Sequence, residues 1–233
     1  MSTIDETQYR RNPSQRTPCI LVLDASGSME NVIAATGKSR IQEVNDGLKQ
    51  LYSELDSDET ARMRVQLAIV CVGGPAGDVA DLLMGWTDVM DFVPPTLVAS
   101  GLTPLGHGLE IALKTLREHK NTLRQSGIGY TRPWMMVMTD GEPTDKDAQW
   151  QAAVQACRGA EAAKECTIFP LGAGEANMSK LQEISSTEAL PMRDRNYKEF
   201  FHWLSSSLSA QSRSQPGANV QLGPVSPWAN VKN

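Results

Sequence analysis

The segment Asp24-Ala25-Ser26-Gly27-Ser28 places one carboxylate and two hydroxyls at alternate positions of a short loop. Gly27 is expected to let the chain turn tightly there, so that the three side-chain oxygens converge. Oxygen is the ligand that hard divalent cations such as Mg²⁺ prefer, and Mg²⁺ usually keeps water where the protein supplies no ligand. The segment therefore predicts part of a weak, open cation site.

Two further stretches offer oxygens of the same kind. Thr103 lies just ahead of a predicted helix, and Asp140 directly follows an apolar run. Taken alone, Thr103 is explained as a helix N-cap, and Thr144 and Asp145 as caps of the helix that begins after them. Taken together at three strand ends, the hydroxyls and carboxylates favour a cation site instead. The candidate ligand set is Asp24, Ser26, Ser28, Thr103 and Asp140.

The elements that must position these residues are short apolar runs with the length and β-branched content of buried strands. They cover residues 18–23, 65–72, 133–138, 166–171 and 189–192, and a weaker run suits an edge strand at 82–86. Amphipathic or Ala-rich segments predict helices at 41–55, 105–121, 147–164, 178–184 and 197–209. Apolar strands that alternate with helices indicate an α/β fold with a mainly parallel sheet covered on both faces. In such sheets ligands bind at the carboxyl ends of the strands.

The composition indicates a globular chain. It has 233 residues, of which 40% are hydrophobic and 21% charged. We expect a polar N-terminal arm at 1–17, one domain at 18–209, and a C-terminal tail at 210–233. Because the tail turns to Ser, Gln, Pro, Gly and Asn, we expect it to be disordered or to lie extended across the domain.

The charge pattern limits the partners. A net charge of −5 without a basic footprint disfavours nucleic acid and anionic membrane as partners. The longest apolar stretches are far shorter than a bilayer requires. The four cysteines are widely spaced with no CxxC pair, which favours free buried thiols. Early acids and the lack of an apolar signal segment at the N-terminus predict a cytoplasmic location.

The candidate ligands, in the order Asp24-x-Ser26-x-Ser28, Thr103 and Asp140, resemble the metal-ion-dependent adhesion site of von Willebrand factor A domains. The strings LVLDASGSM, ASGLTPLGHGL and MVMTDGEPTD more specifically resemble the bacterial TerY group of cytoplasmic A domains, which is associated with tellurium resistance and stress response. The string FHWLSSSLSAQSRSQPG is similar to YegL-type members of that group. The resemblance runs from about residue 18 to residue 216.

The resemblance implies a Rossmann-like, doubly wound, six-stranded sheet with strand order 3-2-1-4-5-6 and an antiparallel edge strand near 82–86. It implies that Ser26 and Ser28 ligate the metal directly, Thr103 directly or through water, and Asp24 and Asp140 mainly through water. The metal would be Mg²⁺, with Mn²⁺ and Ca²⁺ as alternatives. An acidic side chain of a partner protein would complete the coordination. By analogy, the partners would be a PP2C-type phosphatase and a serine/threonine kinase in stress signalling.

Two other functions stay open. A metal-dependent hydrolase would need a base or nucleophile beside the cation. His107, four residues after Thr103, is the candidate base, although a helix-surface or packing role explains it more simply. His119 and His202 lie toward the far ends of their predicted helices. No glycine-rich phosphate motif supports nucleotide binding.

A metal-independent scaffold is the second alternative. It would use the apolar residues of the tail, which are more simply explained as anchors onto the domain's own surface: Leu222, Val225 and Trp228. The expected function is therefore a metal-dependent protein–protein interaction module of the cytoplasm. It is not expected to be an enzyme, and no catalytic or organic-cofactor-binding residue is assigned.

Overall fold

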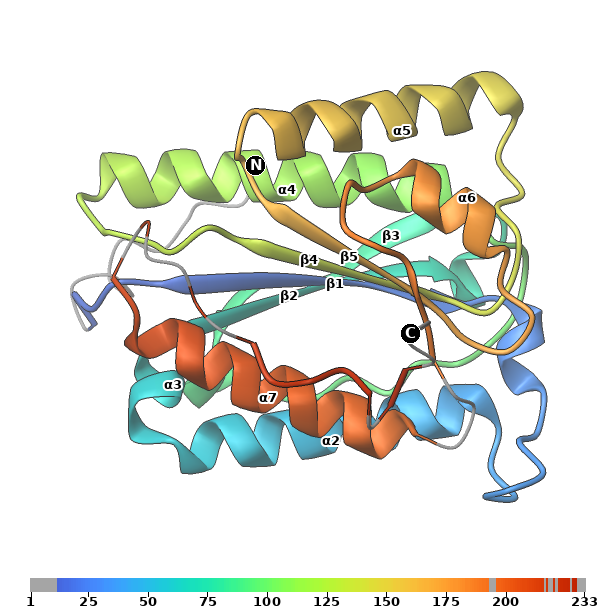
Figure 1. Cartoon of the computed structure of the whole chain (residues 1–233), viewed down its shortest axis with the longest axis horizontal. Coiled ribbons are helices and arrows are strands. Elements are labelled where there is room, and N and C mark those ends of the chain that lie inside the picture. Colours follow the sequence, from blue (N-terminus) through green and yellow to red (C-terminus); the bar gives the residue numbers. More distant parts are fainter. Residues whose placement is uncertain are drawn as a thin grey trace.

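A six-stranded sheet lies between two layers of helices in the computed structural model, which describes residues 12–192, 196–215, 217, 220, 222–226 and 228–229 (Figure 1). The strands are β1 (Thr17–Ala25), β2 (Val65–Gly73), β3 (Ala80–Asp88), β4 (Trp134–Thr139), β5 (Thr167–Gly172) and β6 (Leu190–Pro191). Their order across the sheet is β3-β2-β1-β4-β5-β6. Only the edge pair β2–β3 is antiparallel among these strands. The expected doubly wound α/β fold is therefore confirmed.

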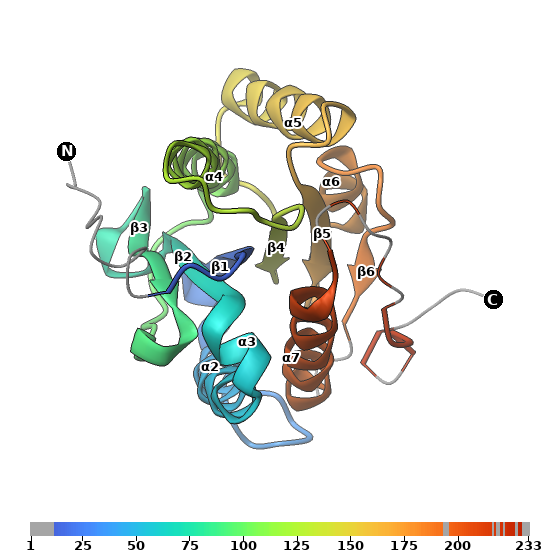
Figure 2. The ribbon, with the colours of Figure 1, turned by 90° about the vertical axis from the view of Figure 1, so that its left-hand side faces the viewer.

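Helices cover both faces of the sheet (Figure 2). One face carries α2 (Arg40–Ser57), α3 (Glu59–Arg64) and α7 (Tyr197–Arg213); the other carries α4 (Leu105–Gln125), α5 (Asp147–Ala162) and α6 (Met178–Glu183). Three 3₁₀ turns lie in the connections: η1 (Gly27–Glu30), η2 (Gly74–Ala76) and η3 (Val89–Asp91). Helix α3 was not predicted, and α7 continues past residue 209, where the sequence pattern placed its end. Within the described residues, no helix is both long and apolar enough to cross a bilayer.

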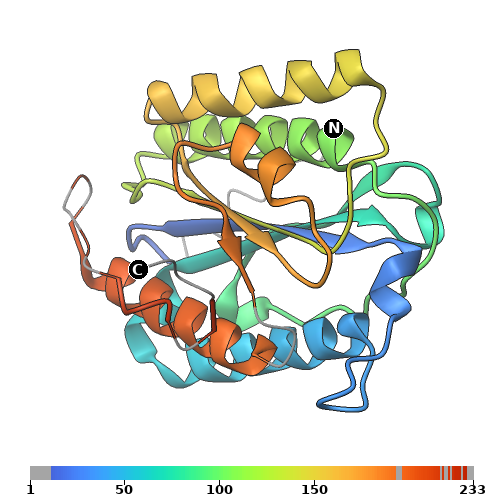
Figure 3. The same cartoon turned by 45° about the vertical axis from the view of Figure 1, so that its right-hand side comes forward.

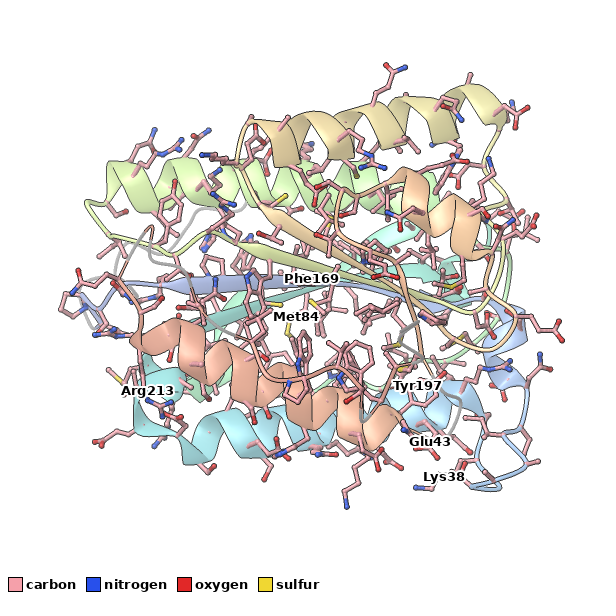
Figure 4. All side chains as sticks on the ribbon, in the orientation of Figure 1. Lys38, Glu43, Met84, Phe169, Tyr197 and Arg213 are labelled. Carbon is pink, nitrogen blue, oxygen red and sulfur yellow. The ribbon has the colours of Figure 1, made fainter. Side chains whose placement is uncertain are left out.

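Two apolar cores explain why the strands show no polar alternation. Alternate residues of β1 face opposite sides: Leu21 joins the core under α2 and α7, while Ile20 joins the core under α4 and α5. Both are almost fully buried. Phe169 belongs to the first of these cores, with its ring centroid 6.4 Å from that of Trp203 in α7, and Met84 of β3 packs partly buried against the same core (both are labelled in Figure 4).

The described part of the tail runs beside α7 (Figure 3). Trp228 is fully buried, with its ring centroid 5.1 Å from that of Phe200 and 5.2 Å from that of Trp203. The indole nitrogen of Trp203 donates a hydrogen bond to the Gly223 carbonyl at 2.9 Å. Leu222 and Val225 pack partly buried against the same core. These contacts make the described tail residues part of the packed domain.

A polar cluster is buried where β2 begins and β3 ends. The Gln66 amide donates to Asp88 Oδ1 at 2.7 Å, and Arg16 Nε lies 3.3 Å from the same oxygen. Gln66 Oε1 contacts His119 Nε2 at 2.7 Å, and Trp86 stacks on the imidazole. Burial, with a smaller contribution from the positive charge of Arg16, lowers the pKa of His119 to about 3. The imidazole is therefore neutral at pH 7.

Candidate metal centre

The candidate ligands gather at the carboxyl ends of β1 and β4. These two strands are neighbours, and the chain leaves β1 toward β2 on one side and leaves β4 toward β5 on the other. The site therefore lies at the topological switch point of the sheet, where open α/β folds bind their ligands. Asp24 itself is still inside β1, paired with Val72, because the strand continues to Ala25 and not only to residue 23 as expected.

Asp24 is buried and both of its carboxylate oxygens accept hydrogen bonds from the chain. Oδ1 accepts from the Ser26 amide at 2.7 Å, and Oδ2 accepts from the Thr139 hydroxyl. Burial raises the pKa of the Asp24 carboxyl; the hydrogen bonds from Thr139 and Ser26 oppose this, while the charge of Asp140 adds to it. Asp24 thus holds the Ser26 loop to Thr139 through these hydrogen bonds, and it is poorly placed to contact a metal ion directly.

Two serine hydroxyls form the centre of the cluster. Ser26 Oγ and Ser28 Oγ are 3.1 Å apart, and Ser28 Oγ donates to Asp140 Oδ1. Neighbouring ligands of an octahedral Mg²⁺ at about 2.1 Å from the metal are separated by about 3.0 Å. The hydroxyl pair therefore has the spacing of one edge of such an octahedron.

Gly27 does not shape this loop in the way the sequence suggested. It is not among the described glycines with positive φ, and a Cβ at this position would meet only the Gly101 carbonyl oxygen at 3.6 Å. The turn is instead made by η1 and by a hydrogen bond from the Gly27 amide to the Gly101 carbonyl at 3.1 Å. The loop therefore turns as expected, but its turn does not use the conformational freedom of glycine.

Thr103 reaches the cluster on a loop fastened to β1. The Ser100 amide donates to the Ala25 carbonyl at 2.9 Å. Thr103 is buried, and a Cβ built on Gly141 would lie 3.7 Å from Thr103 Oγ1 and 3.8 Å from Ser28 Oγ. Both hydroxyls therefore lie beside the residue that follows Asp140, and the structure brings all five predicted residues together.

Asp145 caps a helix, but not the one that follows it, and Thr144 binds the loop just before that same helix. Asp145 accepts from the amides of Gly106 at 2.8 Å and His107 at 3.0 Å, in the first turn of α4. Thr144 Oγ1 accepts from the Thr103 amide at 3.1 Å. The carboxylate satisfies amides that a helix start leaves unpaired and complements the helix dipole. It also ties the Thr103 loop to the Asp140 loop.

This arrangement corrects two expectations. The N-cap of α4 is Pro104 and makes no side-chain capping bond, so Thr103 is not a side-chain cap. The N-cap of α5 is Lys146, again without a side-chain cap, so Thr144 and Asp145 do not cap their own helix. The carboxylate of Asp145 reaches the start of α4 because the two loops lie side by side.

Two residues of the site were missed by the sequence analysis. Thr139 orients Asp24 and also accepts from the Gly141 amide at 3.2 Å. Arg40, the first residue of α2, places Nη1 3.1 Å from Asp140 Oδ2, and the two side chains are 12% and 0% exposed. Thr139 could have been identified from the sequence, because its hydroxyl directly precedes the candidate ligand Asp140. Nothing in the sequence pattern joins Arg40 to a residue one hundred positions away.

The three histidines contact residues outside this cluster. His107 Nδ1 accepts from the Ala80 amide at 3.1 Å and so holds the start of β3. His119 belongs to the buried polar cluster, and His202 lies on α7 with Nδ1 3.0 Å from Glu54 Oε2. The packing interpretation of His107 therefore describes its contacts.

The donor set suits a hard cation in an open site. Within the described residues, no three or more His, Cys, Asp or Glu side chains group so as to hold a metal on their own. The cluster consists instead of three hydroxyls and two carboxylates, which are oxygen ligands of the kind Mg²⁺ and Mn²⁺ accept. Few protein charges leave room for water or for an outside ligand.

The fold and the site together define an open α/β domain with an oxygen-lined candidate cation site at its switch point. The family model of the von Willebrand factor type A domain matches residues 19–206, and the chain belongs to that family. Such domains typically bind divalent metals at a metal-ion-dependent adhesion site and bind partner proteins through it. No curated protein matches the chain.

Solved structures share the fold at low sequence identity. The pilus adhesin SpaC of Lactobacillus rhamnosus GG aligns with a TM-score of 0.64 and 15% identity, covering 84% of this chain and 31% of SpaC. The vWF domain of the pilus tip protein Mfa5 of Porphyromonas gingivalis gives 0.61 and 11%, covering 88% and 99%. Proximal thread matrix protein 1 of the mussel byssus, solved with a zinc-occupied MIDAS motif, gives 0.52 and 18%, covering 84% and 48%. This chain thus spans about a third of SpaC.

Proposed function

We propose that this chain is a non-enzymatic, metal-dependent protein-interaction module. The observation that carries the proposal is the pair of hydroxyls of Ser26 and Ser28 at the spacing of an octahedral edge, with the Asp140 carboxylate bound to Ser28 and Thr103 beside them. Ser26, Ser28 and Thr103 would hold Mg²⁺ or Mn²⁺, and Asp24 and Asp140 would act mainly through water. When bound, the cation supplies electrophilic attraction for an acidic side chain of a partner. The mussel protein with zinc in its MIDAS motif supports the metal role by similarity.

The finer proposal places the chain in the TerY/YegL-like group of the family. The strings around the three site loops and around α7 support it. On this proposal the module works in the cytoplasm, in stress or tellurium-resistance signalling, with a PP2C-type phosphatase and a serine/threonine kinase as partners. The four cysteines, all free and buried, agree with a reducing compartment.

Metal titration tests the site. We expect Mn²⁺ to bind the wild-type protein in calorimetry and to raise its melting temperature, and EDTA to reverse the shift. The double variant S26A/S28A should lose at least tenfold in Mn²⁺ affinity, because two direct ligands are gone. The matched control is S206A, which removes an exposed serine hydroxyl from α7. Equal Mn²⁺ affinity in S26A/S28A and wild type would remove the basis of the proposal.

Co-purification tests the partner. The phosphatase and kinase should be retained by the wild-type module in Mg²⁺ and released in EDTA, while S26A/S28A should retain neither. Retention that is equal in EDTA would instead support the scaffold function. Metal-dependent turnover of a phosphoester that S26A/S28A abolishes would overturn the non-enzymatic part of the proposal.

A further inference from the structure

Arg40 is built into the candidate metal centre. Its guanidinium contacts Asp140 Oδ2 while Ser28 holds Asp140 Oδ1, so both oxygens of this carboxylate are fixed. The guanidinium lies over the backbone of Gly174, where a Cβ would come within 2.3 Å of Arg40 Nη2. The main chain of Arg40 is held as well, since its amide donates to the Asn31 carbonyl at 3.2 Å. The positive charge of the Arg40 guanidinium is therefore a fixed part of the site.

The positive charge of Arg40 changes the net charge of the site. With both carboxylates ionised, Asp24, Asp140 and Arg40 sum to one negative charge, and a divalent metal brings the site to one positive charge. One incoming carboxylate would then make it neutral. Without Arg40, the metal-loaded site would already be neutral, and an incoming carboxylate would leave an uncompensated negative charge in a largely buried place, which is costly.

We infer that Arg40 makes the site selective for an anionic ligand: it weakens metal binding while no carboxylate is bound and compensates the charge of the carboxylate that arrives. This inference rests on the proposed function. Metal and carboxylate then bind cooperatively, each increasing the affinity for the other by the same factor. Arg40 is a specificity-determining residue and not a metal ligand.

The test uses acetate as a carboxylate probe. Mn²⁺ affinity is measured by calorimetry in chloride and in acetate at equal ionic strength, for wild type and for R40Q, with R62Q as the control. Arg62 is an exposed residue of α3 that pairs with Asp56, so R62Q makes the same change of charge away from the site. Neutral acetamide replaces acetate in a parallel titration to separate charge from solvent effects.

We expect acetate to tighten Mn²⁺ binding to wild type and R62Q several-fold, and acetamide to have no effect. R40Q should bind Mn²⁺ about tenfold tighter than wild type in chloride and should lose the acetate effect; R40K, which keeps the charge, should retain it. If R40Q does not fold, R40M gives a second test, because it removes the charge while keeping an unbranched side chain; it should also lose the acetate effect, and an acetate effect equal to that of wild type would overturn the inference.

The outcomes separate this inference from the proposed function. An acetate effect in R40Q equal to that of wild type overturns the role of Arg40 alone. Weaker Mn²⁺ binding in R40Q with the acetate effect retained shows that Arg40 only positions Asp140, and also overturns it. Wild-type protein that binds no Mn²⁺ overturns the proposed function itself.

Discussion

Replacing Thr139 by valine removes a single hydroxyl from the support of the metal centre. Thr139 is fully buried; its hydroxyl donates to Asp24 Oδ2 and accepts from the Gly141 amide. Valine has nearly the same shape, so the change leaves no large cavity. Asp24 loses a hydrogen bond in a buried place, and the half-buried Gly141 amide loses one where water can partly replace it. T139V therefore isolates the polar contribution of this residue.

The stability that T139V should lose can be estimated from the two groups that Thr139 binds, the Asp24 carboxylate and the Gly141 amide. A hydrogen bond to a charged group contributes about 1.5–3 kcal/mol, and the half-buried Gly141 amide adds less than the ~1–3 kcal/mol that a fully buried unpaired amide costs. Because Asp24 can take up a proton when its partner is lost, we expect T139V to lower the free energy of unfolding by about 2–3 kcal/mol at pH 8 and by less at acidic pH. The hydrogen bond from Thr139 favours the ionised carboxyl, so its loss raises the Asp24 pKa further.

Urea unfolding in EDTA measures this loss without any contribution from metal. T139S keeps the hydroxyl and is the matched control, expected to recover most of the stability. In calorimetry, T139V should also bind Mn²⁺ about 10–100-fold more weakly, as is typical when a residue that orients a ligand is lost. A T139V protein within 0.5 kcal/mol of wild type at pH 8 would refute the assigned role of Thr139.

Two further predictions concern the rest of the domain. Since the pKa of His119 is about 3 in the folded protein and about 6.5 in the unfolded chain, the unfolded chain takes up the proton first. The free energy of unfolding should thus fall by about 2 kcal/mol from pH 7 to pH 5 because of this group. Urea titrations should show this decrease in wild type and in the control H202Q, whereas H119Q should not show it. W228A should lower the free energy of unfolding by about 3–5 kcal/mol by leaving a cavity against Phe200 and Trp203; a change below 1 kcal/mol in urea unfolding would show that the tail does not stabilise the domain.

Strands were predicted well because burial on both faces makes them apolar throughout. The run at 65–72 corresponds to β2, which is buried along its whole length. Helix α3 was missed because it has six residues and buries only Ala61, so it has no apolar periodicity. The end of α7 was placed too early because its last turn is polar, although Gln211 and Ser212 are buried there.

Local rules found the candidate ligands but misassigned their supports. The four candidate ligands other than Thr103 could be predicted because the parallel strands β1 and β4 bring their carboxyl ends to one edge. Thr103 follows no parallel strand, contrary to the expectation of three strand ends, and reaches the cluster on the loop between β3 and α4. Asp145 was assigned to the helix that follows it because capping rules consider neighbours in sequence, whereas its carboxylate caps α4. Arg40 could not be predicted, since its contact with Asp140 depends on how the start of α2 lies beside the loops that follow β4 and β5.

The supports explain why this cluster forms an open site. All four carboxylate oxygens of Asp24 and Asp140 already accept hydrogen bonds or contact a cation within the chain: from the Ser26 amide, Thr139, Ser28 and Arg40. The anionic oxygens are therefore committed to holding the loops together, and the neutral hydroxyls are the ligands left for a metal. A cation held mainly by neutral oxygens keeps most of its charge. An acidic partner would recognise that residual charge. The charge remains because the carboxylates of Asp24 and Asp140 bind groups of the chain and do not contact the metal directly.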